Sequence, residues 1–89
     1  MEKHTSHLDI RKRLKRAHGH LAAVIEMIEA GRPCLDLAQQ LYAVESAITK
    51  AKRELIHDHL SHCLGGEGGS HSRAQTDAMR EFAQLAKYL

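Results

Sequence analysis

The sequence predicts an all-α protein, a three-helix subunit in a single domain over residues 1–89. Two long stretches repeat apolar residues at alternating spacings of four and three, which is the period of one helix face. Hydrophobic residues make up 43 % of the chain, yet only two Tyr and one Phe are aromatic. A core of aliphatic side chains suits helices that pack on helices, and association enlarges the core of so small a chain.

The first helix is predicted over about residues 8–30, where six apolar residues follow the helical spacing. They are Ile10, Leu14, Ala17, Leu21, Val24 and Ile28. Gly31 and Pro33 then mark the end of this helix and the start of the next, because Gly accepts a left-handed cap and Pro fits a first helical turn.

The second helix is predicted over about residues 33–63, with an apolar stripe that again alternates four and three. Its members are Leu37, Leu41, Val44, Ile48, Ala51 and Leu55. Such regular spacing favours coiled-coil-like packing. Because the connection is so short, we expect the two helices to form an antiparallel hairpin.

A Gly-rich stretch at 65–70 predicts a linker. The third helix is predicted over about residues 72–88, with Ala78, Phe82, Leu85 and Leu89 on one face.

The overall charge is mild, with a formal net charge of +2. The polar N-terminal segment has no apolar core of the kind found in signal peptides, and no apolar run approaches the roughly 20 residues of a membrane span. We therefore expect a cytoplasmic protein without a membrane partner, whose two cysteines are reduced.

Two cysteines and a histidine carry the strongest chemical signal. His59 and Cys63 lie at i and i+4, on one face of the second helix, and Cys34 opens that helix. Cys34 and His59 are 25 positions apart, or about 37 Å at the helical rise. One straight helix cannot bring them to one ion, whereas the antiparallel helix of a second copy can. The spacing thus predicts two equivalent metal sites shared between two subunits.

Two thiolates and an imidazole are soft ligands that suit Cu(I), and less selectively Zn(II) or Ni(II). His4, His7 or His62 is a possible additional ligand, and would shift the preference towards Ni(II) or Co(II). A pair of buried cysteines beside an interfacial histidine is the structural alternative. No oxyanion-forming loop accompanies His59 and Cys63, so we expect no enzyme activity.

Basic residues gather in two places that an antiparallel hairpin brings together. We expect these clusters to contact DNA phosphates through Arg13, Lys15, Arg16, Lys50 and Arg53. An ordinary solvated helix face is the alternative, and there is no helix-turn-helix signature.

Taken together, these residues resemble the copper-sensitive operon repressor (CsoR) family, whose relatives include nickel/cobalt and formaldehyde sensors. The resemblance covers nearly the whole chain. Its motifs are Arg13-Leu14-Lys15-Arg16, Gly19-His20-Leu21, Met27-Ile28-Glu29, Cys34 with Gln39-Gln40-Leu41, and His57-Asp58-His59-Leu60-Ser61-His62-Cys63.

The resemblance implies antiparallel dimers that assemble into disc-like tetramers. It also implies a repressor that binds double-stranded operator DNA without metal and is released by an inducer to derepress metal efflux genes. Copper sensors of the family use a Cys-His-Cys set, which falls on Cys34, His59 and Cys63. A glutamate of the third helix supports the histidine, and Glu81 is the candidate.

One position departs from that pattern. Copper sensors often carry a tyrosine before the first cysteine, where this chain has Pro33. A nickel/cobalt sensor with a ligand from His4 or His7 therefore stays open, as does a formaldehyde or persulfide sensor that reacts at Cys34.

Overall fold

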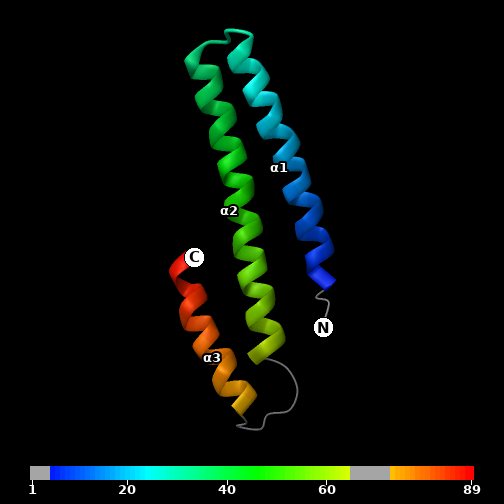
Figure 1. Ribbon diagram of the computed structural model, residues 1–89, viewed down its shortest axis with the longest axis vertical. Coiled ribbons are helices and arrows are strands. Elements are labelled where there is room, and N and C mark those ends of the chain that lie inside the picture. The colour runs from blue at the N-terminus through cyan, green and yellow to red at the C-terminus, as the bar shows by residue number, and fades with distance from the viewer. Residues whose placement is uncertain (1–4, 65–72) are drawn as a thin grey trace.

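The computed structural model describes residues 5–64 and 73–89. Helix α1 spans Thr5–Glu29, α2 spans Cys34–Leu64 and α3 spans Arg73–Leu85, followed by a 3-10 turn, η1, at Ala86–Tyr88. Within these two ranges all regular structure is helical, which confirms the predicted all-α class. Figure 1 shows α1 and α2 as a long antiparallel hairpin, with α3 folded back along the end of α2 that lies away from the hairpin turn.

The hairpin turn follows from one glycine. Gly31 has a φ of 76°, the left-handed conformation that glycine adopts without steric conflict. The N–H of Gly31 donates to the Ile28 carbonyl at 3.0 Å and that of Arg32 to the Met27 carbonyl at 3.1 Å. This pair of bonds is a Schellman cap, which satisfies the last carbonyls of α1. The predicted stop at Gly31 therefore has a direct structural cause.

Helix α2 begins one residue later than expected, because Pro33 precedes its first turn. The Pro33 carbonyl accepts the N–H of Leu37 at 3.1 Å, so Pro33 caps the helix. Asp36, in the first turn, forms an ion pair with Arg32 at 3.1 Å. A negative side chain there also complements the partial positive charge of the helix N-terminus.

The core between the helices is narrow and aliphatic. Among the residues whose burial the structure describes, the buried ones are Ile10, Ala17, Val24, Val44, Ala51 and Ile56. Only some members of each predicted stripe lie in it, because the stripe is wider than the contact between two helices. Leu21, Leu41 and Ile48 stay 38–45 % exposed, and Ile56 is buried in place of Leu55. The hairpin thus leaves part of its apolar stripe unburied within one chain.

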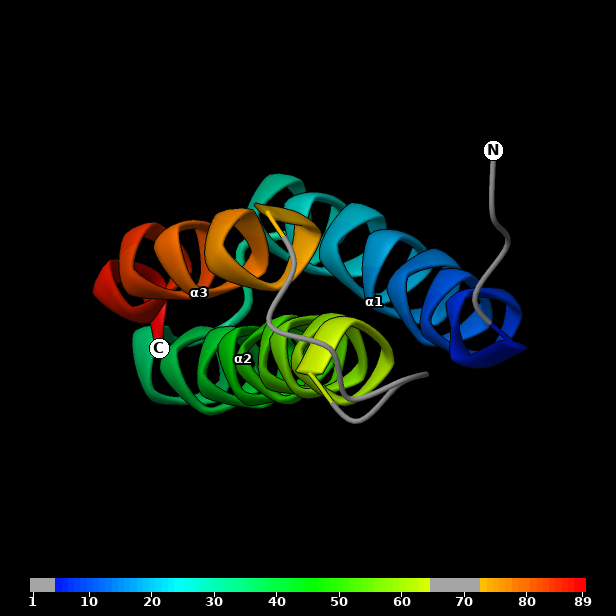
Figure 2. The same ribbon diagram turned by 90° about the horizontal axis from the view of Figure 1, so that it is seen from below.

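Helices α1 and α3 flank α2, with α3 on the side away from α1 in Figure 1 and both helices above α2 in the end-on view (Figure 2). Phe82 and Leu85 are half-buried, whereas Leu89 is exposed, so two members of the predicted face lie away from solvent. The predicted linker at 65–70 lies outside the described residues. Among the helices that are described, none has the length and hydropathy that crossing a membrane requires.

Candidate metal site and basic groove

Helix α2 places two of the predicted metal ligands at opposite ends. Cys34 is its first residue and is an exposed free thiol, while His59 lies in its penultimate turn. The helix continues without a break between them, so they are separated by about 37 Å. Cys63 belongs to the last turn by its backbone. His62 does too, and His4 lies outside the described residues.

Helix α3 holds the imidazole of His59. The Nε2 atom of His59 lies 3.2 Å from Oε1 of Glu81, the residue that the resemblance suggested. The His59 side chain is 25 % exposed and that of Glu81 is 55 % exposed. A carboxylate at Nε2 favours the tautomer with its proton there, which leaves Nδ1 with a lone pair.

The start of α1 reaches the same end of the molecule. His7 Nε2 lies 3.6 Å from Oδ2 of Asp58, the residue before His59. Of the histidines considered as additional ligands, His7 therefore contacts the residue that precedes His59 on α2, while His59 itself faces α3. Within residues 5–64 and 73–89, however, no group of three or more His, Cys, Asp or Glu side chains is arranged to hold a metal ion. The described part of one subunit does not form a complete site.

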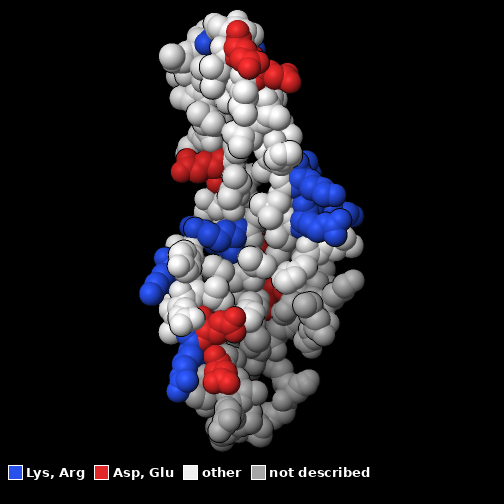
Figure 3. Space-filling model, viewed as in Figure 1, with Lys and Arg blue, Asp and Glu red and all other residues white. Residues whose placement is uncertain are grey.

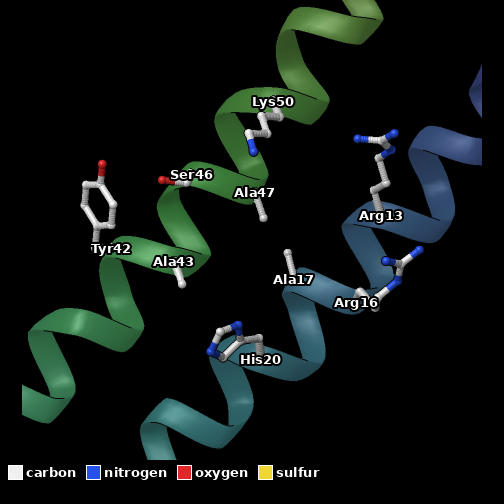
Figure 4. Close-up of a pocket in the computed structure, with 9 residues that line it drawn as sticks. All are labelled: Arg13, Arg16, Ala17, His20, Tyr42, Ala43, Ser46, Ala47 and Lys50. Carbon is white, nitrogen blue, oxygen red and sulfur yellow. The ribbon is translucent and has the colours of Figure 1, made fainter.

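A basic groove runs between α1 and α2 on one side of the buried seam. It has a volume of about 570 Å³. Its lining is Arg13, Arg16, Ala17, His20, Tyr42, Ala43, Ser46, Ala47 and Lys50. Figure 4 shows Arg13 and Lys50 on facing helices at one end of the groove, with His20 and Tyr42 towards the other.

Three of the five predicted DNA-contacting residues line this basic groove, namely Arg13, Arg16 and Lys50. Arg53 lines a smaller hollow that adjoins it through Lys50. Lys15 is exposed on α1 and lines neither hollow. On the face shown in Figure 3, Lys and Arg gather over the middle of α1, and acidic side chains lie near the hairpin turn. The folded hairpin does bring most of the two basic clusters together.

Two polar lining residues, Tyr42 and Ser46, were missed by the sequence reasoning, which followed charge along α2. Ser46 and Tyr42 stand one and two turns before Lys50 on α2, and His20 stands one turn after Arg16 on α1. Their spacing of four residues from the predicted cations, which places them on the same helix face, was the signal that could have found them. The Nε2–H of His20 donates to Oε1 of Gln40 at 2.6 Å, which links α1 to α2 beside the groove.

A second hollow is apolar and lies on the other side of the seam. Leu21, Leu41, Val44 and Ile48 supply its apolar lining. By helical spacing, Leu14 and Leu55 extend the same sides of α1 and α2, since each lies seven residues from a lining residue. We call this surface the apolar flank. Soluble monomers rarely expose so continuous an aliphatic surface.

A comparison with family models matches residues 6–88 to "Metal-sensitive transcriptional repressor". The chain belongs to this family. The match covers all three helices, including the candidate metal ligands Cys34, His59 and Cys63 and the cations of the basic groove.

Curated relatives carry the name "Copper-sensing transcriptional repressor CsoR". The Mycobacterium ulcerans protein is 44 % identical over 52 residues, covering 58 % of this chain and 44 % of the relative. The Mycobacterium tuberculosis protein is 34 % identical over 73 residues, covering 76 % of this chain and 61 % of the relative. The chain thus spans about half the length of these mycobacterial relatives. The Bacillus subtilis protein is 29 % identical and covers 98 % of this chain and 99 % of the relative. No solved structure matches the chain.

Proposed function

We propose that this protein is a metal-responsive transcriptional repressor in which residues 1–89 act as one unit. It binds double-stranded operator DNA without metal and releases it when Cu(I) binds, which derepresses metal efflux genes. The observation that carries the proposal is the position of Cys34 and His59 at opposite ends of one continuous helix. The names of the relatives support copper and repression.

The metal site is shared between two subunits in this proposal. The apolar flank is the surface through which a second copy packs, with its α2 antiparallel to the first. Burying Leu41 and Ile48, each nearly half exposed in the single chain, supplies the hydrophobic driving force. Cys34 of one subunit then lies beside His59 and Cys63 of the other, twice per dimer. Two such dimers form the disc-like tetramer that the family resemblance implies.

The donor set fits Cu(I). Two thiolates are soft ligands, and His59 offers Nδ1 because its Nε2 faces Glu81. Cys34 stands in the first turn of α2 with its thiol exposed, so a ligand from a second copy can reach the same ion. Cu(I) supplies no chemistry in this role beyond joining the two ends, so the protein acts as a sensor and not as an enzyme.

DNA binding is assigned to the two basic clusters, with Arg13 and Lys50 at the centre and Lys15, Arg16 and Arg53 beside them. Each cation that meets a phosphate releases condensed counterions from the duplex, which makes the affinity steeply dependent on salt. Metal binding at the ends of α2 and DNA binding at its middle use one helix, so each event changes the free energy of the other.

An anaerobic titration of promoter DNA complexes tests the proposal. Reduced protein is bound to a fluorescent duplex from upstream of its gene, and Cu(I) or Ni(II) is added at buffered free concentrations. We expect Cu(I) to release the DNA near one ion per subunit. The C34A variant should bind the duplex as tightly as the natural protein but resist release. A C34A variant that no longer binds DNA would make Cys34 a structural residue and refute the mechanism.

The contact of His7 with Asp58, which precedes His59 on α2, favours one second candidate, a Ni(II)- or Co(II)-sensing repressor that adds an N-terminal histidine ligand. Release by Ni(II) at a lower free concentration than Cu(I), lost in an H7A variant, would establish it. If neither metal releases the DNA, the exposed thiol of Cys34 makes an aldehyde or persulfide sensor the better explanation. Zn(II) is a further competitor in the same titration.

A further inference from the structure

We infer that His20 and Gln40 are positioning residues of the repressor, whose hydrogen bond sets the register of α1 on α2 and so holds the cations of the two helices together. The inference rests on the proposed function and adds to it, because neither residue is assigned there to DNA or to metal. A surface built from two helices fits a duplex only while those helices keep one relative position. His20 and Gln40 therefore act on DNA affinity through Arg13 and Lys50, and not by contacting the duplex.

The bond is a short polar link across the helix pair. Nε2 of His20 on α1 lies 2.6 Å from Oε1 of Gln40 on α2, and both side chains are half-buried. Figure 4 shows the His20 ring pointing from α1 towards α2. A second polar contact, 3.6 Å between His7 Nε2 and Asp58 Oδ2, joins the helices farther from the turn. Along both helices the cations of the basic groove lie between these two links.

The seam beside those cations is lined by alanines. Ala17 and Ala51 are buried in it, and Ala43 and Ala47 face α1 from α2. Methyl groups form a shallow surface and the hydrophobic effect has no direction, so their burial holds the helices together but sets their register only weakly. A polar residue in an apolar helix interface specifies register, because it has one partner at one position. The bond of His20 supplies that specification here.

A change of register would separate the cations from their phosphates. Arg16 lies one turn before His20 on the same wall of the groove. Lys50 lies ten residues beyond Gln40 on one continuous helix, or about 15 Å. A slide of one helical residue, about 1.5 Å, exceeds the range of about 0.5 Å in which an N–H···O bond forms. The bond therefore controls contacts that lie one to three turns away from it.

The same link bears on the response to metal. Cu(I) and DNA oppose each other in the proposed function, so they favour different arrangements of the helices. The bond is present together with a groove that cations line from both helices, and we assign it to the arrangement that binds DNA. Breaking it then lowers the affinity for DNA and raises the affinity for Cu(I), since the two arrangements compete.

Substitutions with matched controls test this inference. Fluorescence anisotropy with the promoter duplex is measured for H20A, Q40A and the double variant, with H18A and Q39A as controls. His18 and Gln39 are exposed residues of the same types on the same two helices. H20Q is the rescue variant, because its amide keeps an N–H donor of similar reach and carries no charge. Circular dichroism and sedimentation check that each variant keeps its fold and assembly.

We expect H20A and Q40A each to weaken DNA binding by about fivefold, the effect of one hydrogen bond. The slope against salt should not change, because no phosphate contact is removed. The double variant should lose no more than either single variant, and H20Q should recover most of the affinity. In competition with a Cu(I) chelator without DNA, both single variants should bind Cu(I) more tightly, by up to about fivefold. The controls should match the natural protein.

The other outcomes overturn the inference in distinguishable ways. A loss in H20A that Q40A does not share, with a shallower salt slope, would place His20 on a phosphate. A fall of DNA and Cu(I) affinity together would make the bond a purely structural one. If both variants bind DNA as the controls do, the inference is wrong and the proposed repressor function stands. If the natural protein binds no duplex, the proposed function fails and the inference fails with it.

Discussion

Glu81 offers the most direct test of the metal site, because it contacts a proposed ligand without being one. Its Oε1 lies 3.2 Å from His59 Nε2. Replacing Glu81 by Gln keeps the size of the side chain and a hydrogen-bond acceptor but removes the negative charge. The imidazole then loses the carboxylate that orients its ring.

The expected effect of E81Q is a loss of about tenfold in Cu(I) affinity, or ~1.4 kcal/mol. Carboxylates behind a metal-bound histidine contribute roughly 10- to 100-fold, and the low end applies here. The Glu81 side chain is 55 % exposed, so solvent screens much of its interaction with the ring. DNA affinity without metal should not change, since Glu81 is on α3 and does not line the basic groove.

Competition with a Cu(I) chelator of known affinity measures this loss, and D77N is the matched control. Asp77 is an exposed carboxylate one turn earlier on α3, so D77N removes the same charge from the same helix. Equal losses in both variants would mean that net charge, and not the contact with His59, sets the affinity. An unchanged affinity in E81Q would refute the role of Glu81 and remove the reason to assign Nδ1 of His59 to the metal.

Two further predictions concern assembly and the hairpin turn. I48K should convert the oligomer to monomers in sedimentation velocity and abolish Cu(I) binding, because it places a charge in the apolar flank; the exposed control A22K should do neither. G31A should lower the free energy of unfolding in urea by about 1 kcal/mol, because Gly31 has a φ of 76° with open space around it. G31N should lose less, and an unchanged stability in G31A would show that the cap does not need glycine.

Local signals predicted the helices well, because each has a cause within a few residues. The apolar spacing set α1 and α2, and Gly31 ends α1 through its own backbone conformation. The pattern did not tell which apolar residues are buried inside one chain. Leu41 and Val44 look alike in the stripe, yet only Val44 is buried. An apolar helix face marks every residue that is buried in the working protein. It does not separate residues buried inside one chain from residues buried between chains.

The candidate site, too, could be predicted from the sequence only in part. Cys34, His59 and Cys63 followed from their spacing, whereas Glu81 was suggested only by resemblance. The Gly-rich stretch at 65–70 gave no means to set the register of α3 on α2, so its contact with His59 needed a structure. Tyr42 and Ser46 escaped because hydroxyl residues on an exposed helix carry no signal of their own. Their place in the lining of the groove emerges only with the structure, because Arg13 and Arg16 line it from another helix.

The separation of Cys34 and His59 along α2 has a genetic consequence. In the proposed antiparallel dimer each site takes its cysteine from one subunit and its histidine from the other. A C34A subunit paired with an H59A subunit therefore contains one site with both defects and one site with none. Two alleles that are each unresponsive to metal would complement each other when expressed in the same cell. Alleles that share the same defect would not.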